Sequence, residues 1–300
     1  MAESFSTGCG GKGANQAVAA ARLSKLSSGE RLANVEIIGA VGVDDFGRSL
    51  KRNLSADGVN VSKVKEIEGV ATGTATILVE KETGENRILV AAGANNHVVS
   101  KLDDGGRYGG VLLCQLECPL DSVLSHMKAA KLSGSIVLLN PAPATQLSSE
   151  FFTNTDYLIL NESEAALLSR SELTHPFPDA QLEAITQQLI EKGVQVVVIT
   201  LGGEGSYYGT AQGASGRVRA EKVKVVDTTA AGDTFVGAFA VRIALSRSES
   251  NVTESNIRNA MEFGTVASAL TVQKAGAQDS IPRLADIPDS WLRFLQRITK

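Results

Sequence analysis

Cysteine is scarce in this sequence of 300 residues, which contains only Cys9, Cys114 and Cys118. Three irregularly spaced cysteines do not make a disulfide framework, so we expect free thiols in a reducing, cytoplasmic setting, with the nucleus as a further compartment. Cys114 and Cys118 are expected to be small core residues. The three histidines are scattered and complete no zinc site with them. We therefore expect neither a disulfide-stabilised domain nor a protein-built metal cage.

An excess of positive charge is also absent. Lys and Arg number 29 against 33 Asp and Glu, which gives a net charge of −4. This balance excludes the basic surface typical of proteins that bind nucleic acid or anionic membranes. No apolar run approaches the ~20 residues that span a bilayer, and residues 1–7 show no secretory signal. We expect a soluble protein whose partners are small molecules.

Apolar segments recur throughout the chain and alternate between two types. Short β-branched runs predict buried strands, and segments with apolar spacing near 3.6 predict helices between them. This alternation predicts an α/β fold with a doubly wound, mostly parallel sheet flanked by helices. The polar stretches 24–31, 102–110 and 211–219 are interpreted as solvated connectors. The predicted strands are 35–41, 111–115, 136–140, 157–160 and 196–200. The predicted helices are 15–23, 121–131, 163–168, 181–192, 233–245 and 257–272.

Polar residues follow the carboxyl ends of these strands. Ligands of open parallel sheets bind beyond those ends, so the polar residues should converge on one rim of the sheet. Segment 222–226 is interpreted as a further strand leading to this rim. Segments 72–79 and 86–91 instead predict a hairpin across a turn at 82–85. The rim residues are Glu117, Asn140, Asn161, Gly202 and Asp227.

The segment 226–239 carries the strongest chemical signal. It reads Val-Asp-Thr-Thr-Ala-Ala-Gly-Asp-Thr-Phe-Val-Gly-Ala-Phe, a turn of small residues that opens an apolar helix. Free amides and the positive end of the helix dipole favour an anion at such a turn. Asp233 makes sense there as the acceptor of a proton from a hydroxyl that attacks a phosphate. A plain helix-capping aspartate is the alternative interpretation.

A second glycine-rich motif, Gly-Gly-Lys-Gly-Ala-Asn-Gln-Ala at 10–17, opens another apolar helix. It fits neither the phosphate loop of P-loop proteins nor the dinucleotide-binding turn. In this order, the two motifs resemble the two signatures of the PfkB-type carbohydrate kinases, and further blocks resemble the ribokinase group of that family. The resemblance covers nearly the whole chain and implies a ribokinase-like fold. The further blocks are 39–47, 115–119, 161–165, 200–203 and 274–280.

The resemblance implies a role for each motif. Asp233 matches the catalytic base, and the backbone amides of Ala231, Gly232 and Asp233 match the anion hole for the transferred phosphoryl group. A small β-lid at about 70–92 would cover the sugar and form a homodimer contact. The residues that match sugar-binding positions are Gly11, Lys12, Asn15, Glu117 and Asp233.

For ATP and Mg²⁺, the resemblance places Asn161 and Glu164 near the phosphates, with Glu164 ordering the water shell of the magnesium ion. Asn161 and Glu164 also have the spacing of a helix capping box, and both interpretations can hold. Gly232 and Thr265 match further nucleotide positions, Thr265 beside the adenine. The predicted nucleotide loop is Thr200, Leu201, Gly202, Gly203, Glu204 and Gly205.

The resemblance also implies a site for a monovalent cation, K⁺, beside the anion hole. Its ligands in the family are largely backbone carbonyls, which a sequence does not reveal. The matching positions are Asp227, Thr229, Thr271, Lys274, Gly276 and Ser280.

The chain departs from the family pattern at its beginning. Family members start with a strand that bears a sugar-binding Asp, whereas here the first motif already begins at Gly10. We expect residues 1–300 to form a single kinase domain that lacks this first strand. The resemblance implies ATP-dependent phosphorylation of D-ribose to ribose 5-phosphate. The alternatives are a PfkB kinase for another sugar or a nucleoside, and a truncated, non-catalytic nucleotide-binding protein.

Overall fold

The structure is a computed structural model that describes residues 6–79, 86–100, 108–246 and 253–292. Its main sheet has six strands in the order β10-β9-β8-β7-β6-β5. Strands β5 to β8 are parallel, and β9 and β10 are antiparallel to their neighbours. The predicted mostly parallel α/β sheet is confirmed. The strands are β1 (Glu36–Gly42), β2 (Asn60–Ile67), β3 (Thr74–Val79), β4 (Asn86–Ala91), β5 (Val111–Cys114), β6 (Ile136–Leu139), β7 (Tyr157–Asn161), β8 (Val196–Thr200), β9 (Ser206–Thr210) and β10 (Ser215–Val218).

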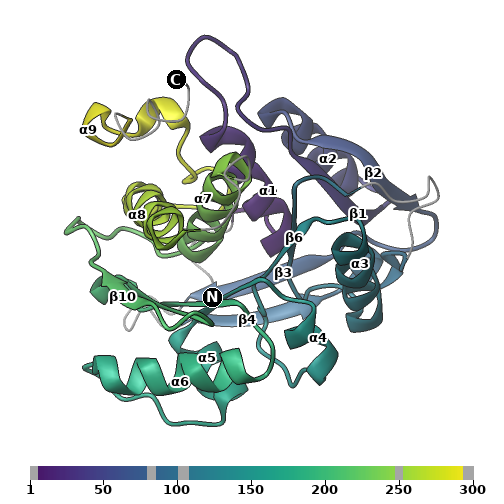
Figure 1. The fold of residues 1–300 in the computed structure, drawn as a ribbon. Coiled ribbons are helices and arrows are strands. Elements are labelled where there is room, and N and C mark those ends of the chain that lie inside the picture. Colours follow the sequence, from purple (N-terminus) through teal and green to yellow (C-terminus); the bar gives the residue numbers. More distant parts are fainter. Residues whose placement is uncertain (1–5, 80–85, 101–107, 247–252, 293–300) are drawn as a thin grey trace.

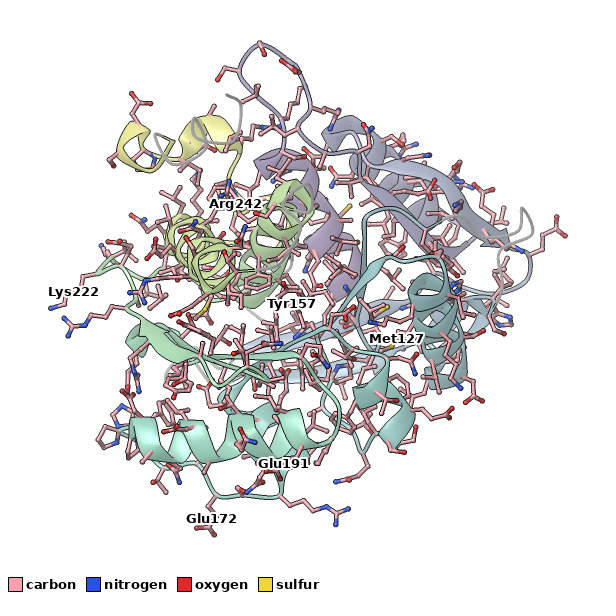
Figure 2. The ribbon with its side chains drawn as sticks, in the orientation of Figure 1. Met127, Tyr157, Glu172, Glu191, Lys222 and Arg242 are labelled. Carbon is pink, nitrogen blue, oxygen red and sulfur yellow. The ribbon has the colours of Figure 1, made fainter. Side chains whose placement is uncertain are left out.

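Helices cover both faces of the six-stranded sheet (Figure 1). Met127 and Leu182, from α3 and α6, pack with Leu158 on one face. On the other face Phe239 of α7 packs against Tyr157 with ring centroids 5.6 Å apart. Met127 and Tyr157 lie inside the molecule, as Figure 2 shows. None of the described helices is both long and apolar enough to cross a membrane. The helices are α1 (Lys12–Leu23), α2 (Asp45–Asp57), α3 (Leu120–Leu132), α4 (Ser149–Thr153), α5 (Glu162–Ser169), α6 (Asp179–Glu191), α7 (Ala231–Ser246), α8 (Glu254–Thr271) and α9 (Asp289–Leu292).

β1 and β2 form a separate parallel pair connected by α2. Asp44 caps α2 by accepting a hydrogen bond from the Gly47 amide, and Gly58 ends the helix with a φ of 85°. Among the described strands, β1 pairs only with β2, and β5 pairs only with β6. Cys118, which follows β5, packs against the small cluster that contains Ala40 of β1. Where a single sheet was predicted, the described strands therefore form the six-stranded sheet and, separate from it, the pair of β1 and β2.

The predicted hairpin is confirmed by β3 and β4, which pair antiparallel from Thr74 with Ala91 to Val79 with Asn86. Apolar side chains on both of its faces are exposed to solvent. The predicted turn at 82–85 and most of the predicted connector 102–110 lie outside the described residues. The exposed apolar residues of the hairpin are Ile77, Leu78, Leu89 and Val90.

Two predicted segments are wrong. Residues 222–226 form no strand, although their polar and apolar residues alternate. Val225 and Val226 are exposed, and Figure 2 shows Lys222 pointing away from the molecule. Conversely, the predicted connector 211–219 contains β10, an edge strand in which only Val218 is buried. Both errors have the same cause, because a strand requires a neighbour with free backbone groups, and neither composition nor alternation reveals one.

Candidate active site

A cavity of about 240 Å³ lies at the carboxyl ends of the parallel strands. Asn161 and Thr200, the last residues of β7 and β8, form part of its wall. Lys12 from the start of α1, Glu164 from α5 and Asp233 from α7 also line it. Asn140 and Thr228 are the other polar residues of the lining. The structure therefore brings the two glycine-rich motifs, far apart in the sequence, to one cavity at the predicted rim.

Asp233 lies in the first turn of α7. The turn before the helix is tight, because Ala230 has a positive φ of 61°, a conformation that is uncommon for residues other than glycine. The Ala231 amide donates to the Thr228 carbonyl at 3.2 Å. The amides of Gly232 and Asp233 have no backbone acceptor in the described structure, as expected for a first helical turn. Of the three amides of the predicted anion hole, those of Gly232 and Asp233 are therefore available to bind a ligand.

Two side chains from α1 hold the carboxylate of Asp233. The Asn15 Nδ2 donates to Oδ2 at 2.8 Å, and the Gln16 Nε2 donates to Oδ1 at 2.9 Å. The Oδ1 atom of Asn15 is buried and has no hydrogen-bond partner among the described residues. A buried amide oxygen without a donor is costly, so it is suited to accept a hydrogen bond from a ligand hydroxyl.

Glu117 and the start of α1 carry most of the residues predicted to bind the sugar. Lys12 lines the cavity, whereas Gly11, Asn15 and Glu117 lie beside it, outside its lining. Gly11 precedes the helix with a φ of 90°, and the amide of Lys12 donates to Glu117 Oε2 at 2.7 Å. Burial raises the pKa of Glu117, and the Lys12 amide and charge only partly oppose this shift. The free carboxylate oxygen remains available as an acceptor. Gly11 and Lys12 therefore lie next to Glu117, and the part of these residues in sugar binding stays a prediction.

Asn161 and Glu164 form the predicted capping box at the start of α5. Asn161 Oδ1 accepts from the Glu164 amide at 2.8 Å, and Glu164 Oε2 accepts from the Asn161 amide at 2.9 Å. Burial raises the pKa of Glu164, against the effects of the Asn161 amide and the charge of Lys12. Both residues also line the cavity, so they can cap α5 and contact a ligand at the same time.

The predicted nucleotide loop follows β8. Gly202, Gly203 and Glu204 form a short 3₁₀ turn, and the Leu201 amide donates to the Gly205 carbonyl at 2.8 Å. Thr200 lines the cavity, whereas the side chain of Leu201 is part of the core. The carboxylate of Glu204 contacts His175 and Arg217, so it stabilises the loop from outside the cavity.

Thr265 lies on α8 and is buried, outside the lining of the cavity. The neighbouring Gly264 faces the ring of Phe235, where an added Cβ would lie 2.8 Å from the ring. One turn later, the hydroxyl of Ser268 donates to the Ala231 carbonyl at 2.8 Å. This face of α8 therefore supports the start of α7.

The predicted cation segment packs against the turn that contains Asp227. One carboxylate oxygen of Asp227 accepts from the Thr229 amide, and the other accepts from the Gly276 amide, both at 2.9 Å. Burial tends to raise the pKa of Asp227, but a hydrogen bond from the Thr229 side chain and those from the Gly276 and Thr229 amides outweigh it and hold the pKa below its ordinary value. The hydroxyl of Thr271 bonds to that of Thr234, next to Asp233. The turn and the segment are therefore held side by side near the start of α7.

The last two predicted cation residues belong to the same segment. The Lys274 amide donates to the Thr271 carbonyl at 3.1 Å, and the buried hydroxyl of Ser280 donates to the Ala277 carbonyl at 2.8 Å. No group of three or more His, Cys, Asp or Glu residues in the described ranges could hold a metal ion. A divalent cation in this cavity would therefore take most of its ligands from water and phosphate, as Mg²⁺ does.

Three contributors to the site were not predicted as site residues. Gln16 contacts Asp233, Gln115 contacts Gln16, and Ala230 shapes the turn before α7. Asn140, predicted only as a rim residue, also bonds to Gln16. A signal for Gln16 was present, because two adjacent amide residues interrupt an otherwise apolar helix.

Fold and cavity together define an α/β phosphotransferase, since a helix start with free amides binds anions and an adjacent carboxylate can accept a proton. The family model described as "pfkB family carbohydrate kinase" matches residues 1–284. The chain therefore belongs to the pfkB family of carbohydrate kinases.

Known relatives share most of the chain. It is 44% identical to the protein named ribokinase from Schizosaccharomyces pombe over 294 aligned residues. The aligned residues make up 96% of this chain and 88% of the relative. A ribokinase structure from Thermotoga maritima is similar with a TM-score of 0.78 and 35% identity, over 95% of this chain and 87% of the other. The Arabidopsis thaliana ribokinase complexed with ribose and ATP is similar with a TM-score of 0.75 and 28% identity, over 96% and 87%.

Proposed function

We propose that this protein transfers the terminal phosphoryl group of ATP to D-ribose and produces ribose 5-phosphate and ADP. The observation that carries the proposal is the position of Asp233, whose carboxylate is held by Asn15 and Gln16 beside the free amides of α7. The names of the similar proteins supply the substrates, since relatives named ribokinase cover nearly the whole chain. One of these structures contains both ribose and ATP.

In this mechanism Asp233 accepts the proton of the sugar hydroxyl while that oxygen forms a bond to the γ-phosphorus. The bond from the γ-phosphorus to the bridging oxygen breaks, and its electron pair leaves with ADP. The amides of Gly232 and Asp233 stabilise the negative charge on the transferred group, and Ala231 adds its amide when it is released from Thr228.

The sugar would be held beside the cavity, between the start of α1 and Glu117. Glu117 has a free carboxylate oxygen and Asn15 has a free buried amide oxygen, and both accept hydrogen bonds from hydroxyl groups. Gly11 lies within the reach of Glu117 and leaves room for a ligand. Lys12 faces the cavity and supplies a positive charge between the sugar and the phosphates.

The nucleotide is placed along Asn161, the loop from Thr200 to Gly205, and Gly232, with Thr265 toward the adenine. Mg²⁺ would neutralise phosphate charge, and Glu164 would order its water shell.

K⁺ would be held between the Asp227 turn and the 271–280 segment. It would draw on carbonyl and hydroxyl oxygens there, including those of Thr229, Thr271, Lys274, Gly276 and Ser280. The contact between Asp227 and Gly276 supports this assignment, because it keeps the two segments adjacent.

Residues 1–300 are proposed to act as a single kinase domain in the cytoplasm, a reducing compartment in which the free Cys9, Cys114 and Cys118 would persist. The hairpin of β3 and β4 is proposed as a lid over the sugar and as a homodimer contact. Its support is the exposure of Ile77, Leu78, Leu89 and Val90, apolar residues that a ligand or a partner subunit would cover.

An assay of ADP release against a panel of sugars tests the substrate. The panel is D-ribose, 2-deoxyribose, fructose and a nucleoside, at equal concentrations and with Mg²⁺ and K⁺ present. We expect the highest kcat/KM for ribose. A higher kcat/KM for another panel member would replace ribose as the substrate. ADP release that is independent of every acceptor would contradict the kinase function.

A further inference from the structure

Gln16 lies at the centre of a chain of amide side chains that ends on Asp233. It is completely buried, and its Nε2 donates both to Asp233 Oδ1 and to Asn140 Oδ1, each at 2.9 Å. Its Oε1 accepts from the Gln115 Nε2 at 2.6 Å. Asn140 in turn donates through Nδ2 to the Ile159 carbonyl at 2.9 Å. The chain therefore joins the ends of β5 and β6 and the middle of β7 to the carboxylate at the start of α7.

The direction of every hydrogen bond in this chain is fixed by its two ends. An ionised carboxylate and a backbone carbonyl only accept, so Asp233 and the Ile159 carbonyl must each receive an N–H group. Gln16 must therefore turn its nitrogen toward Asp233 and its oxygen toward Gln115. Asn140 must turn its nitrogen toward Ile159 and its oxygen toward Gln16. Only one orientation of each amide satisfies the whole chain, so the network is rigid.

Asp233 needs such support, because rotation of a carboxylate about its last side-chain bond meets only a low barrier. Asn15 holds Oδ2 with its amide nitrogen, while its amide oxygen is suited to bind the substrate, so Asn15 combines both roles. Gln16 holds Oδ1, and its amide nitrogen and oxygen are both engaged by the side chains of Asp233, Asn140 and Gln115. A misplacement of about 1 Å at a reacting group can lower a rate by about 100-fold.

We propose that Gln16, oriented by Gln115 and Asn140, is a positioning residue that fixes the carboxylate of Asp233 for proton transfer from the substrate. This role rests on the proposed function, and it assigns to Gln16 a contribution to kcat rather than to substrate binding. Because the strand ends supply the anchor, Asp233 is positioned by the sheet as well as by its own helix.

The test compares Gln16→Met with the wild type in steady-state kinetics. Met keeps the length of the side chain and removes its donors and acceptor, so we expect kcat to fall by about 10- to 100-fold. The KM values for ribose and ATP should change less than about threefold, because no substrate contact is removed. A kcat within about threefold of the wild-type value would overturn the proposal, whatever happens to the melting temperature.

Ser24→Ala is the matched control on the same helix. Ser24 is completely buried at the end of α1, and its hydroxyl bonds only to the backbone carbonyls of Ala21 and Ala33. This variant should lower the melting temperature and leave kcat unchanged. An equal loss of kcat in Ser24→Ala and Gln16→Met would show a general effect of destabilising α1, and would contradict positioning.

The coupling along the chain is tested by Gln115→Met. Alone, it should lower kcat less than Gln16→Met does, because Gln16 keeps its bond to Asp233. Combined with Gln16→Met, it should add almost nothing, since the path to Asp233 is already broken. Fully additive losses would show that Gln115 does not act through Gln16.

If Gln16→Met does not fold, Gln16→Glu replaces it. The like charge facing Asp233 should then lower kcat at least as much, and an unchanged kcat would overturn the proposal.

Crystal structures of the wild type and the Gln16 variant separate this proposal from the proposed function. We expect the Asp233 carboxylate to rotate or to adopt several orientations in the variant, even if ribose proves not to be the substrate. An unchanged, single orientation of Asp233 would overturn the positioning role. A wild type without ribose phosphorylation would instead contradict the proposed function.

Discussion

The six-stranded sheet and the region of β1 to β4 differ in how completely they are buried. In β7 the first four residues are all buried, and β8 shows the same pattern. In β1 only the last three residues are buried, and the β3–β4 hairpin exposes apolar residues on both faces. The proposed nucleotide side of the cavity therefore rests on a core covered by helices on both faces, whereas the hairpin proposed to cover the sugar does not.

The hairpin depends instead on a few polar contacts at its base. There the carboxylate of Asp44 accepts hydrogen bonds from the amide and the hydroxyl of Thr72. Segments with few buried contacts open at lower free-energy cost than core strands. The comparison indicates that the phosphoryl site is the more firmly held part, and that the β3–β4 hairpin is the part able to rearrange around a substrate.

Asp233 lies where the two regions meet, and its substitution should have the largest effect. Asp233→Asn keeps the size of the side chain and the backbone amides but removes the proton acceptor. We expect kcat to fall by about 10²- to 10⁴-fold, with nearly unchanged affinity for ATP. Turnover and calorimetric titration with ATP measure the two quantities. Wild-type turnover would show that another group accepts the proton.

Glu117→Gln should affect the sugar side alone. It removes a charged acceptor, so the KM for ribose should rise by about 10- to 100-fold, with little change in the KM for ATP. Equal changes in both KM values would contradict the division of the cavity into two sides.

The same variant should show a pH-dependent gain in stability. Burial raises the pKa of Glu117, so the folded wild type favours the protonated carboxyl group. The resulting stabilisation is fully present below the ordinary pKa of about 4.3 and is lost as the pH rises through the folded-state pKa. The melting temperature of Glu117→Gln relative to the wild type should therefore increase from about pH 4 to about pH 8. A difference that shrinks over this range would show that the ionised carboxylate stabilises the fold.

Asp44→Asn should have the smallest effect of the three substitutions. Hydrogen bonds from the Thr72 side chain and amide, and from the Gly47 amide, lower the pKa of Asp44. The ionised Asp44 carboxylate therefore stabilises the fold above its ordinary pKa of about 3.9. This stabilisation is lost as the pH falls through the lower pKa of the folded state. We expect a modest rise in the KM for ribose and a slightly lower melting temperature at neutral pH. The melting-temperature difference should disappear in acid, and a difference that grows in acid would contradict this contact.

The core of the sheet and the location of the site could be predicted from the sequence. Strands β5 to β8 are continuous apolar runs, and such runs leave few alternatives to a buried parallel strand. α2 was missed because it buries few residues, among them Leu54, although Asp44 and Gly58 mark its ends. The network around Gln16 could not be predicted, because its amide orientations depend on groups from four separate segments.

The most direct test of the central claim is the identity of the phosphorylated product. Wild type and Asp233→Asn are incubated with D-ribose, ATP, Mg²⁺ and K⁺, and the products are followed by phosphorus NMR. The account predicts a phosphomonoester on O5 of ribose, formed in equal amount with ADP by the wild type and almost absent with the variant. Formation of inorganic phosphate instead of the sugar ester, or equal ester formation by both proteins, would contradict it.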